Sequence, residues 1–207
     1  MSSNTDTMIT HLNEADFVEV DNNLFSVFLP YAVEDNFTGE KLYPNHSCFL
    51  KSEMNEALKK ANEIFLSSGF RIHIWDAYRP FHVQEKLLSH TPDDKYIARP
   101  VRENGVIVSG SPHNRGQAID LTLVTLDGEY TNMPSEFDDL SEKAWRTPES
   151  WTDETKSLMK LKEDTLTKFG FIPNPNEWWH YNFKGKKLYN ALYDLPLPDI
   201  DHSTRDN

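Results

Sequence analysis

Cysteine is almost absent from this sequence of 207 residues, in which Cys48 stands alone. A single thiol cannot form an intrachain disulfide, and it excludes a metal site built from several thiolates. Basic residues are also few: 21 Lys and Arg stand against 33 Asp and Glu, which gives a formal net charge of -12. Such a chain repels a phosphate backbone, so we expect no nucleic-acid partner.

Long apolar runs are missing as well. No apolar stretch approaches the roughly 20 residues that a membrane-spanning helix needs. The opening residues, MSSNTDTMITHLNEADF, contain neither the basic segment nor the apolar segment of a secretion signal. We therefore expect a cytoplasmic protein without a membrane partner. The chain is long enough for one sizeable hydrophobic core, and no repeat or long linker divides it.

Apolar residues recur at helical spacing in three segments and alternate with polar residues in several others. These patterns predict helices over residues 53–67, 80–89 and 153–169 and strands over residues 71–78, 118–126 and 178–183, with two short strands near 17–20 and 24–29 around an Asn-Asn turn. Ser52 and Thr152 stand where they would cap the first and last helices. Together the elements indicate an α+β protein with a mostly antiparallel sheet flanked by helices.

The domain organisation follows from the same patterns. Residues 1–15 are polar, and we expect a flexible N-terminal segment there. Residues 16–193 contain all the periodic segments, so they predict a single domain. Residues 194–207 mix prolines with polar and acidic residues, which predicts a flexible acidic C-terminal tail.

One short stretch, SPHNRGQAIDLTL, brings a histidine and an aspartate to the start of a predicted strand. Catalytic zinc takes three nitrogen or oxygen ligands from the protein and keeps a further position for water. His113 and Asp120 match two of these ligands, because Gly116 permits a tight turn between them. Ala118 leaves space for an ion on the strand face of Asp120. His180, in NEWWHYNF, supplies the third ligand if its strand lies beside that of Asp120.

Two further residues have the chemistry of amide hydrolysis. Glu177 lies three residues before His180 and is the candidate general base, since a metal-activated water needs a proton acceptor. Arg79, in WDAYRP, is the candidate stabiliser of the oxyanion that forms when a carbonyl becomes tetrahedral. Asp76 precedes Arg79 by three residues, and we expect the two side chains to pair. The set predicts metal-assisted hydrolysis of an amide.

The motifs resemble those of a known family, the D-alanyl-D-alanine dipeptidases of the VanX type. The resemblance lies in SPHNRGQAIDLTL, EWWHY, WDAYRP and YAVEDNFTG, and it covers residues 31–183. The family belongs to a wider zinc peptidase group that includes D,D-carboxypeptidases and L-alanyl-D-glutamate peptidases. The resemblance therefore implies the zinc D,D-peptidase fold, which is similar to that of hedgehog domains.

Residue by residue, the resemblance implies one zinc ion (Zn2+) per chain on His113, Asp120 and His180. It also implies that Glu177 is the general base and that Arg79 polarises the scissile carbonyl. These roles agree with those expected from the residues alone.

The substrate pocket is implied by the resemblance only. Asp138, in SEFDD, would hold the free amino terminus of the substrate, and Ser111 would contribute nearby. Tyr31, Asn36 and Phe37 would form the pocket wall, although packing in the core explains these three residues equally well.

The implied activity is hydrolysis of the small dipeptide D-Ala-D-Ala to two D-alanines. Two alternatives stay open: a D,D-carboxypeptidase or L,D-peptidase that acts on peptidoglycan peptides, and a catalytically inactive zinc-binding interaction protein. The sequence also leaves open whether the protein forms a homo-oligomer. It does not choose between resistance to glycopeptide antibiotics and recycling of D-alanine as the biological role.

Overall fold

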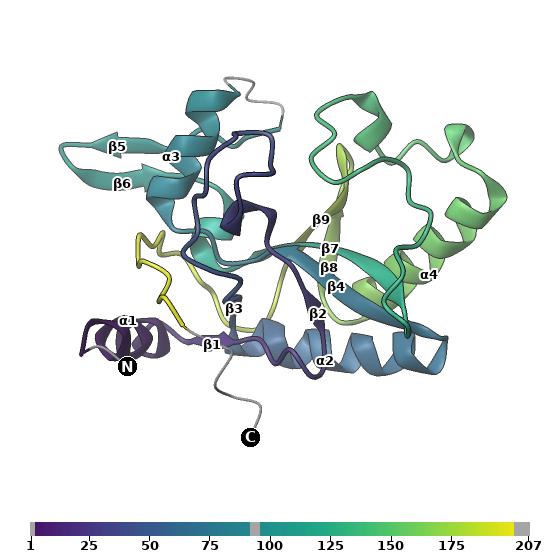
Figure 1. Ribbon diagram of the computed structural model, residues 1–207, viewed down its shortest axis with the longest axis horizontal. Helices are drawn as coiled ribbons and strands as arrows, with labels where there is room; N and C mark the ends of the chain where they lie inside the picture. Colours follow the sequence, from purple (N-terminus) through teal and green to yellow (C-terminus); the bar gives the residue numbers. More distant parts are fainter. Residues whose placement is uncertain (1–2, 92–95, 201–207) are drawn as a thin grey trace.

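The computed structural model describes residues 3–91 and 96–200. A five-stranded sheet lies at its centre (Figure 1), with strand order β2-β4-β7-β9-β8. Its strands are β2 (Ser26–Val27), β4 (Phe70–Asp76), β7 (Ala118–Thr125), β9 (Glu177–Phe183) and β8 (Phe171–Asn174). Within this sheet β2 and β4 run parallel, and the other neighbouring pairs are antiparallel. The predicted α+β fold with a mostly antiparallel sheet is therefore confirmed.

Helices and two smaller sheets surround the central sheet (Figure 1). The helices are α1 (Ser3–Glu14), α2 (Ser52–Ser67), α3 (Phe81–His90) and α4 (Asp153–Lys168). The smaller sheets pair β1 (Phe17–Glu19) with β3 (Phe49–Lys51) and β5 (Val101–Glu103) with β6 (Val106–Ser109). Short 3-10 helices lie at η1 (Pro30–Ala32), η2 (Pro112–Arg115), η3 (Glu142–Ala144) and η4 (Pro148–Ser150). Within the described ranges, no helix combines the length and the apolar character needed to cross a membrane.

The two faces of β7 have different environments, as its alternating sequence predicts. Ile119, Leu121 and Leu123 are fully buried and belong to the main hydrophobic core. The same core includes the apolar side of α2, whose buried members are Met54, Leu58, Ala61 and Phe65. Because side chains alternate along a strand, Asp120 faces the opposite side, where the candidate site lies.

The two predicted helix caps have different outcomes. Thr152 caps α4 as predicted, since its side chain accepts a hydrogen bond from the backbone N–H of Thr155. Ser52 does not cap α2, because the helix already begins at that residue. The Ser52 hydroxyl instead donates a 2.6 Å hydrogen bond to Oδ1 of Asp16. A tertiary partner has therefore replaced the expected local one.

The first two short strands do not pair with each other across the Asn-Asn turn. β1 pairs with β3 in antiparallel fashion, and β2 adds to the edge of the central sheet beside β4. Both partners lie far away in the sequence, so the alternating pattern of these segments identified strands but not their pairing.

The described parts of the two terminal segments, residues 3–15 and 194–200, contain structure that the sequence did not predict. Residues 3–14 form α1 instead of a flexible segment, and Leu12 on this helix is fully buried in the main core. In the predicted flexible tail, residues 194–200 have no helix or strand, yet Leu197 and Ile200 are buried. The side chain of Asn45 also donates to the carbonyls of Pro198 and Ile200. The rest of the predicted tail, 201–207, lies outside the described residues.

Gly116 makes the turn between η2 and β7 possible. It has the left-handed backbone conformation, with φ of 68°. A Cβ at this position would lie 2.4 Å from Cε1 of Phe17, whose ring is fully buried. A side chain is therefore disfavoured twice, by the backbone conformation and by the space.

Gly116→Ala should cost about 1–2 kcal/mol of unfolding free energy for the left-handed conformation and about 1–3 kcal/mol more for crowding against Phe17. Gly128→Ala is the matched control, because Gly128 also has a positive φ, 91°, but a Cβ added there would have no described atom within 4 Å. Urea denaturation of both variants measures the difference. Equal losses would contradict the crowding against Phe17.

Candidate active site

The pairing of β7 with β9 places two of the expected ligands directly opposite each other. Asp120 and His180 are partners in the antiparallel register. His113 approaches from η2, where the Ser111 side chain accepts a hydrogen bond from the His113 backbone N–H. All three side chains are buried, and they offer ligand atoms within 4.8 Å of one another. The strand adjacency that the sequence only assumed is therefore present.

Hydrogen bonds on the outer side of each imidazole determine which ring nitrogen faces inward. Nδ1 of His113 donates to the carbonyl of Ala77 at 2.7 Å, so its Nε2 presents a lone pair to the centre. Nε2 of His180 lies 3.1 Å from Oδ1 of Asn182, to which it donates, so its Nδ1 presents the other lone pair. Outer partners of this kind orient histidine ligands in metal sites.

Three electron-rich atoms consequently converge on one point. Nε2 of His113 and Nδ1 of His180 lie 3.2 Å apart. Oxygens of Asp120 lie 3.3 Å from the first nitrogen and 2.9 Å from the second. Although burial alone would raise the pKa of Asp120, the adjacent imidazoles hold that pKa well below its ordinary range. Two nitrogen lone pairs and a carboxylate fit a divalent cation such as zinc.

Arg79 lies beside this cluster in a fixed orientation. Its Nε and Nη2 donate to Oδ2 of Asp76 at 2.8 and 2.6 Å, which shows the pairing expected from their spacing. Nη1 donates to the side chain of Gln84 at 2.7 Å, and Nη2 lies 3.7 Å from Oδ2 of Asp120. The other oxygen of Asp76 accepts from the Tyr43 hydroxyl at 2.8 Å. This network holds a buried guanidinium next to the candidate metal site.

Glu177 lies at the beginning of β9 on the same side of the sheet. Its Oε2 accepts a 2.7 Å hydrogen bond from Nδ2 of Asn174 and lies 3.9 Å from Nδ1 of His180. Burial raises the pKa of Glu177 above its ordinary value, and the nearby charge of Asp120 adds to this effect. A carboxylate with a raised pKa is suited to accept a proton and release it again.

Asp138 and Tyr31 form a second polar group across the pocket. The Tyr31 hydroxyl donates to Oδ2 of Asp138 at 2.9 Å. Burial raises the pKa of Asp138 well above its ordinary range, and the charge of Asp120 raises it further. Asp138 also has a positive φ of 58°, which is uncommon for a residue other than glycine. Strained conformations of this kind cluster at functional sites.

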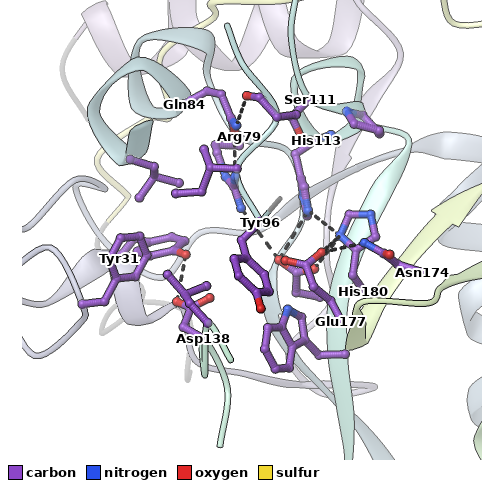
Figure 2. Close-up of a pocket in the computed structure, with 18 of the residues that line it drawn as sticks. Tyr31, Arg79, Gln84, Tyr96, Ser111, His113, Asp138, Asn174, Glu177 and His180 are labelled. Atoms are coloured by element: carbon purple, nitrogen blue, oxygen red, sulfur yellow. Dashed lines mark hydrogen bonds and ion pairs between the residues drawn. The ribbon is translucent and has the colours of Figure 1, made fainter. Parts of the chain in front are cut away.

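These groups surround one small cavity of about 220 Å³. Figure 2 shows Tyr31 and Asp138 on one side of it and His113, Glu177 and His180 on the other. Arg79, Ser111, Tyr96 and Asn174 also line it. The volume is below the 300–1,000 Å³ that is typical of pockets for drug-sized ligands. The cavity therefore suits a small molecule that reaches from the three candidate metal ligands to Asp138.

The predicted wall residues have different positions. Tyr31 and Phe37 line the cavity, and their rings pack edge to face. Asn36 does not line it. Its side-chain amide donates to the carbonyls of Val33 and Glu40, so Asn36 folds the loop that carries Phe37. An asparagine side chain readily bonds nearby backbone, which explains the position of Asn36.

Sequence reasoning missed five polar or aromatic residues of the site: Gln84, Tyr96, Asn174, Trp179 and Asn182. Asn182 had a usable signal, since it lies two residues after His180 and thus on the same strand face. Gln84 lies on α3, Asn174 on β8 and Tyr96 in the segment before β5, and none of the three carries a motif. Their place depends on how α3, β8 and the segment before β5 meet around the cavity.

The fold and the site together define this protein as a metallopeptidase. The chain belongs to the peptidase M15 family, whose model is described as D-ala-D-ala dipeptidase and matches residues 13–199. The family resemblance noted in the motifs is thereby confirmed.

Curated relatives agree with this assignment. A D-alanyl-D-alanine dipeptidase of Escherichia coli (strain K12) is 33% identical over 166 residues, covering 80% of this chain and 82% of the relative. One of Enterococcus faecium is 30% identical over 182 residues, covering 81% of this chain and 90% of the relative. One of Enterococcus faecalis (strain ATCC 700802 / V583) is 31% identical over 183 residues, covering 82% and 86%.

His180→Ala should greatly reduce the amount of zinc that the purified protein retains. The change removes one of three inward-facing ligand atoms, and so it should weaken zinc binding by more than the roughly 10–100-fold caused by loss of an outer partner. Metal analysis after equilibration with zinc and gel filtration gives the stoichiometry. His82→Ala is the control, since the His82 side chain is 52% exposed on α3. Full zinc occupancy in the His180 variant would remove that residue from the site.

Proposed function

We propose that this protein hydrolyses the dipeptide D-Ala-D-Ala to two D-alanines and that His113, Asp120 and His180 hold one zinc ion. The observation that carries the proposal is the small cavity with a ligand cluster on one side and a buried carboxylate on the other. The names of the curated relatives support the choice of dipeptide. When bound, zinc supplies a Lewis acid that polarises the scissile carbonyl and makes water more acidic.

Glu177 provides the proton transfers in this proposal. Its carboxylate accepts a proton from the attacking water, a step that its raised pKa favours, and then gives that proton to the departing amine. The hydrogen bond from Asn174 fixes one carboxylate oxygen at 2.7 Å. The other oxygen thereby keeps a defined direction toward the substrate. One carboxylate can act in this way as base and then as acid.

Arg79 stabilises negative charge on the substrate carbonyl oxygen. A guanidinium has five N–H groups, and the bonds to Asp76 and Gln84 use three of them. The remaining two can donate to an oxyanion as it develops. Because the network already holds the group, little reorganisation is needed during the reaction.

Asp138 recognises the free amino terminus of the dipeptide. An ammonium ion next to it favours the ionised carboxylate and so offsets the effect of burial on its pKa. Tyr31 holds the second contact to the same carboxylate. A buried ammonium leaves no path for a longer chain, which restricts the substrate to a dipeptide.

A substrate panel tests this proposal. Zinc-loaded protein should hydrolyse D-Ala-D-Ala, with kcat/KM for N-acetyl-D-Ala-D-Ala lower by at least about 100-fold, because the acetyl group removes the charge that Asp138 binds. Release of D-alanine measures both rates. Turnover of only an acylated pentapeptide that ends in D-Ala-D-Ala would contradict the dipeptidase and favour a peptidoglycan peptidase. No turnover by zinc-loaded protein would favour an interaction protein.

Glu177→Gln should lower kcat by about 10²–10⁴-fold, because glutamine cannot accept a proton from water. The zinc content should stay near one ion per chain, since Glu177 is not one of the three zinc ligands His113, Asp120 and His180. Glu129→Gln is a control of equal charge change at an exposed position. Loss of zinc from the Glu177 variant would instead make Glu177 a ligand or a structural support.

A further inference from the structure

The β8–β9 hairpin contains a break in its pairing next to the candidate site. Pro173 pairs with Tyr181, but the next residue of β8, Asn174, pairs with Glu177. One step along β8 therefore corresponds to four steps along β9. Residues 178–180 form a bulge to which the register assigns no β8 partner. Such bulges are common next to active sites, where they change the direction of a side chain.

Arg146, which follows η3, fills the place of the missing strand partner. Its Nη2 donates to the carbonyl oxygens of Trp178 and His180 at 2.9 and 3.3 Å. Its Nε donates to the carbonyl oxygen of Asn174 at 2.6 Å, on the other side of the break. Three backbone acceptors on two strands thus share one planar guanidinium.

The surroundings hold the Arg146 side chain in place. The side chain is only 10% exposed, its Nη1 pairs with Glu163 of α4, and its guanidinium lies 4.6 Å from the centre of the Tyr181 ring. The backbone N–H of Arg146 also donates to the carbonyl of Pro175 at the tip of the hairpin. A rigid and nearly buried arginine can determine the geometry of the backbone that it binds.

Lys162 adds a second donor from α4. Its Nζ donates to the carbonyl oxygen of Trp178 at 3.0 Å, the same atom that Arg146 binds. Lys162 is fully buried, and its Nζ lies 4.4 Å from the centre of the Trp178 ring. α4 therefore supports the bulge through Lys162 directly and through Glu163 by way of Arg146.

The residues that Arg146 holds carry the chemistry of the site. His180 belongs to the bulge, and Glu177 is the β9 residue directly before it. Asn174, whose carbonyl binds Arg146, uses its own side chain to hold the Glu177 carboxylate at 2.7 Å. Arg146 thus binds the backbone of a candidate ligand directly and reaches the candidate base through Asn174.

We infer that Arg146 is a positioning residue that takes the place of the absent β8 partner. It keeps the His180 ring directed toward His113 and Asp120 and keeps the Glu177 carboxylate directed toward the substrate. The role of Arg146 in catalysis rests on the proposed function. Its structural role, control of the β9 bulge, does not. Arg146 lines no wall of the catalytic cavity, so it acts through the backbone and not by contact with substrate.

The test compares Arg146→Ala and Arg146→Lys with wild type and with Arg102→Ala. Arg102 is the matched control, because it also pairs with two groups, Glu85 and Asp194, but lies on the exposed β5–β6 hairpin. Three measurements apply: amide hydrogen exchange by mass spectrometry on metal-free protein, zinc affinity by chelator competition, and kcat and KM for D-Ala-D-Ala.

Arg146→Ala should increase exchange in residues 174–181 and leave α2 unchanged. It should weaken zinc binding by about 10–100-fold, the range for outer partners of metal ligands. It should lower kcat to a similar extent with KM within about threefold, because Asp138 and Arg79 still bind the substrate. Arg146→Lys should recover part of the zinc affinity and part of kcat, since one ammonium can donate to some but not all of the three carbonyls. Arg102→Ala should change none of these quantities.

Should Arg146→Ala fail to fold, Arg146→Lys carries the same test at smaller amplitude. Lys162→Met is a further test variant. The Trp178 carbonyl keeps its Arg146 donor in this variant, so zinc affinity should fall less than in Arg146→Lys. The inference is overturned if folded Arg146 variants match Arg102→Ala in exchange, zinc affinity and kcat. A wild-type protein that does not bind zinc or cleave D-Ala-D-Ala would instead contradict the proposed function, while the exchange measurement would still decide the role of Arg146.

Discussion

The pairing of β7 with β9 is the constraint on which the rest of the site depends. It places Asp120 opposite His180, two residues that are 60 positions apart in the sequence. The buried face of β7 fixes this register, because a slip by one residue would turn Ile119, Leu121 and Leu123 away from the core. The stability of the core and the geometry of the ligand cluster are therefore set by the same hydrogen-bonded ladder.

The charges that line the cavity explain why the three candidate ligands fit a bound cation. Arg79 compensates Asp76 and part of Asp120, but two inward lone pairs of His113 and His180 remain next to a carboxylate. A divalent cation would balance the charge of that cluster, and burial raises the pKa of Asp138 on the other side of the cavity. The ligand cluster and Asp138 lie on opposite sides of a cavity of about 220 Å³.

Local sequence patterns identified α2, α3 and α4, the strands β4, β7 and β9, and the segment that carries His113 and Asp120, because side-chain periodicity and a turn glycine are local properties. The same reasoning failed where a tertiary partner replaced a local one. Ser52 bonds Asp16 instead of capping α2, and the polar N-terminal segment became a helix because Leu12 packs into the core. Asn36 shows the reverse case, since it serves its own loop and not the cavity.

The sequence by itself determined the chemistry that is present: two histidines, the carboxylates and the arginine, spaced so that a strand and its preceding turn present His113 and Asp120 together. The tertiary structure decided which distant groups join them. Arg146 had no motif because its partners are backbone carbonyls, which every residue possesses and no sequence pattern distinguishes. Its place follows from the break in the pairing of β8 with β9 and from the packing of α4 beside β8, which are both features of the tertiary structure.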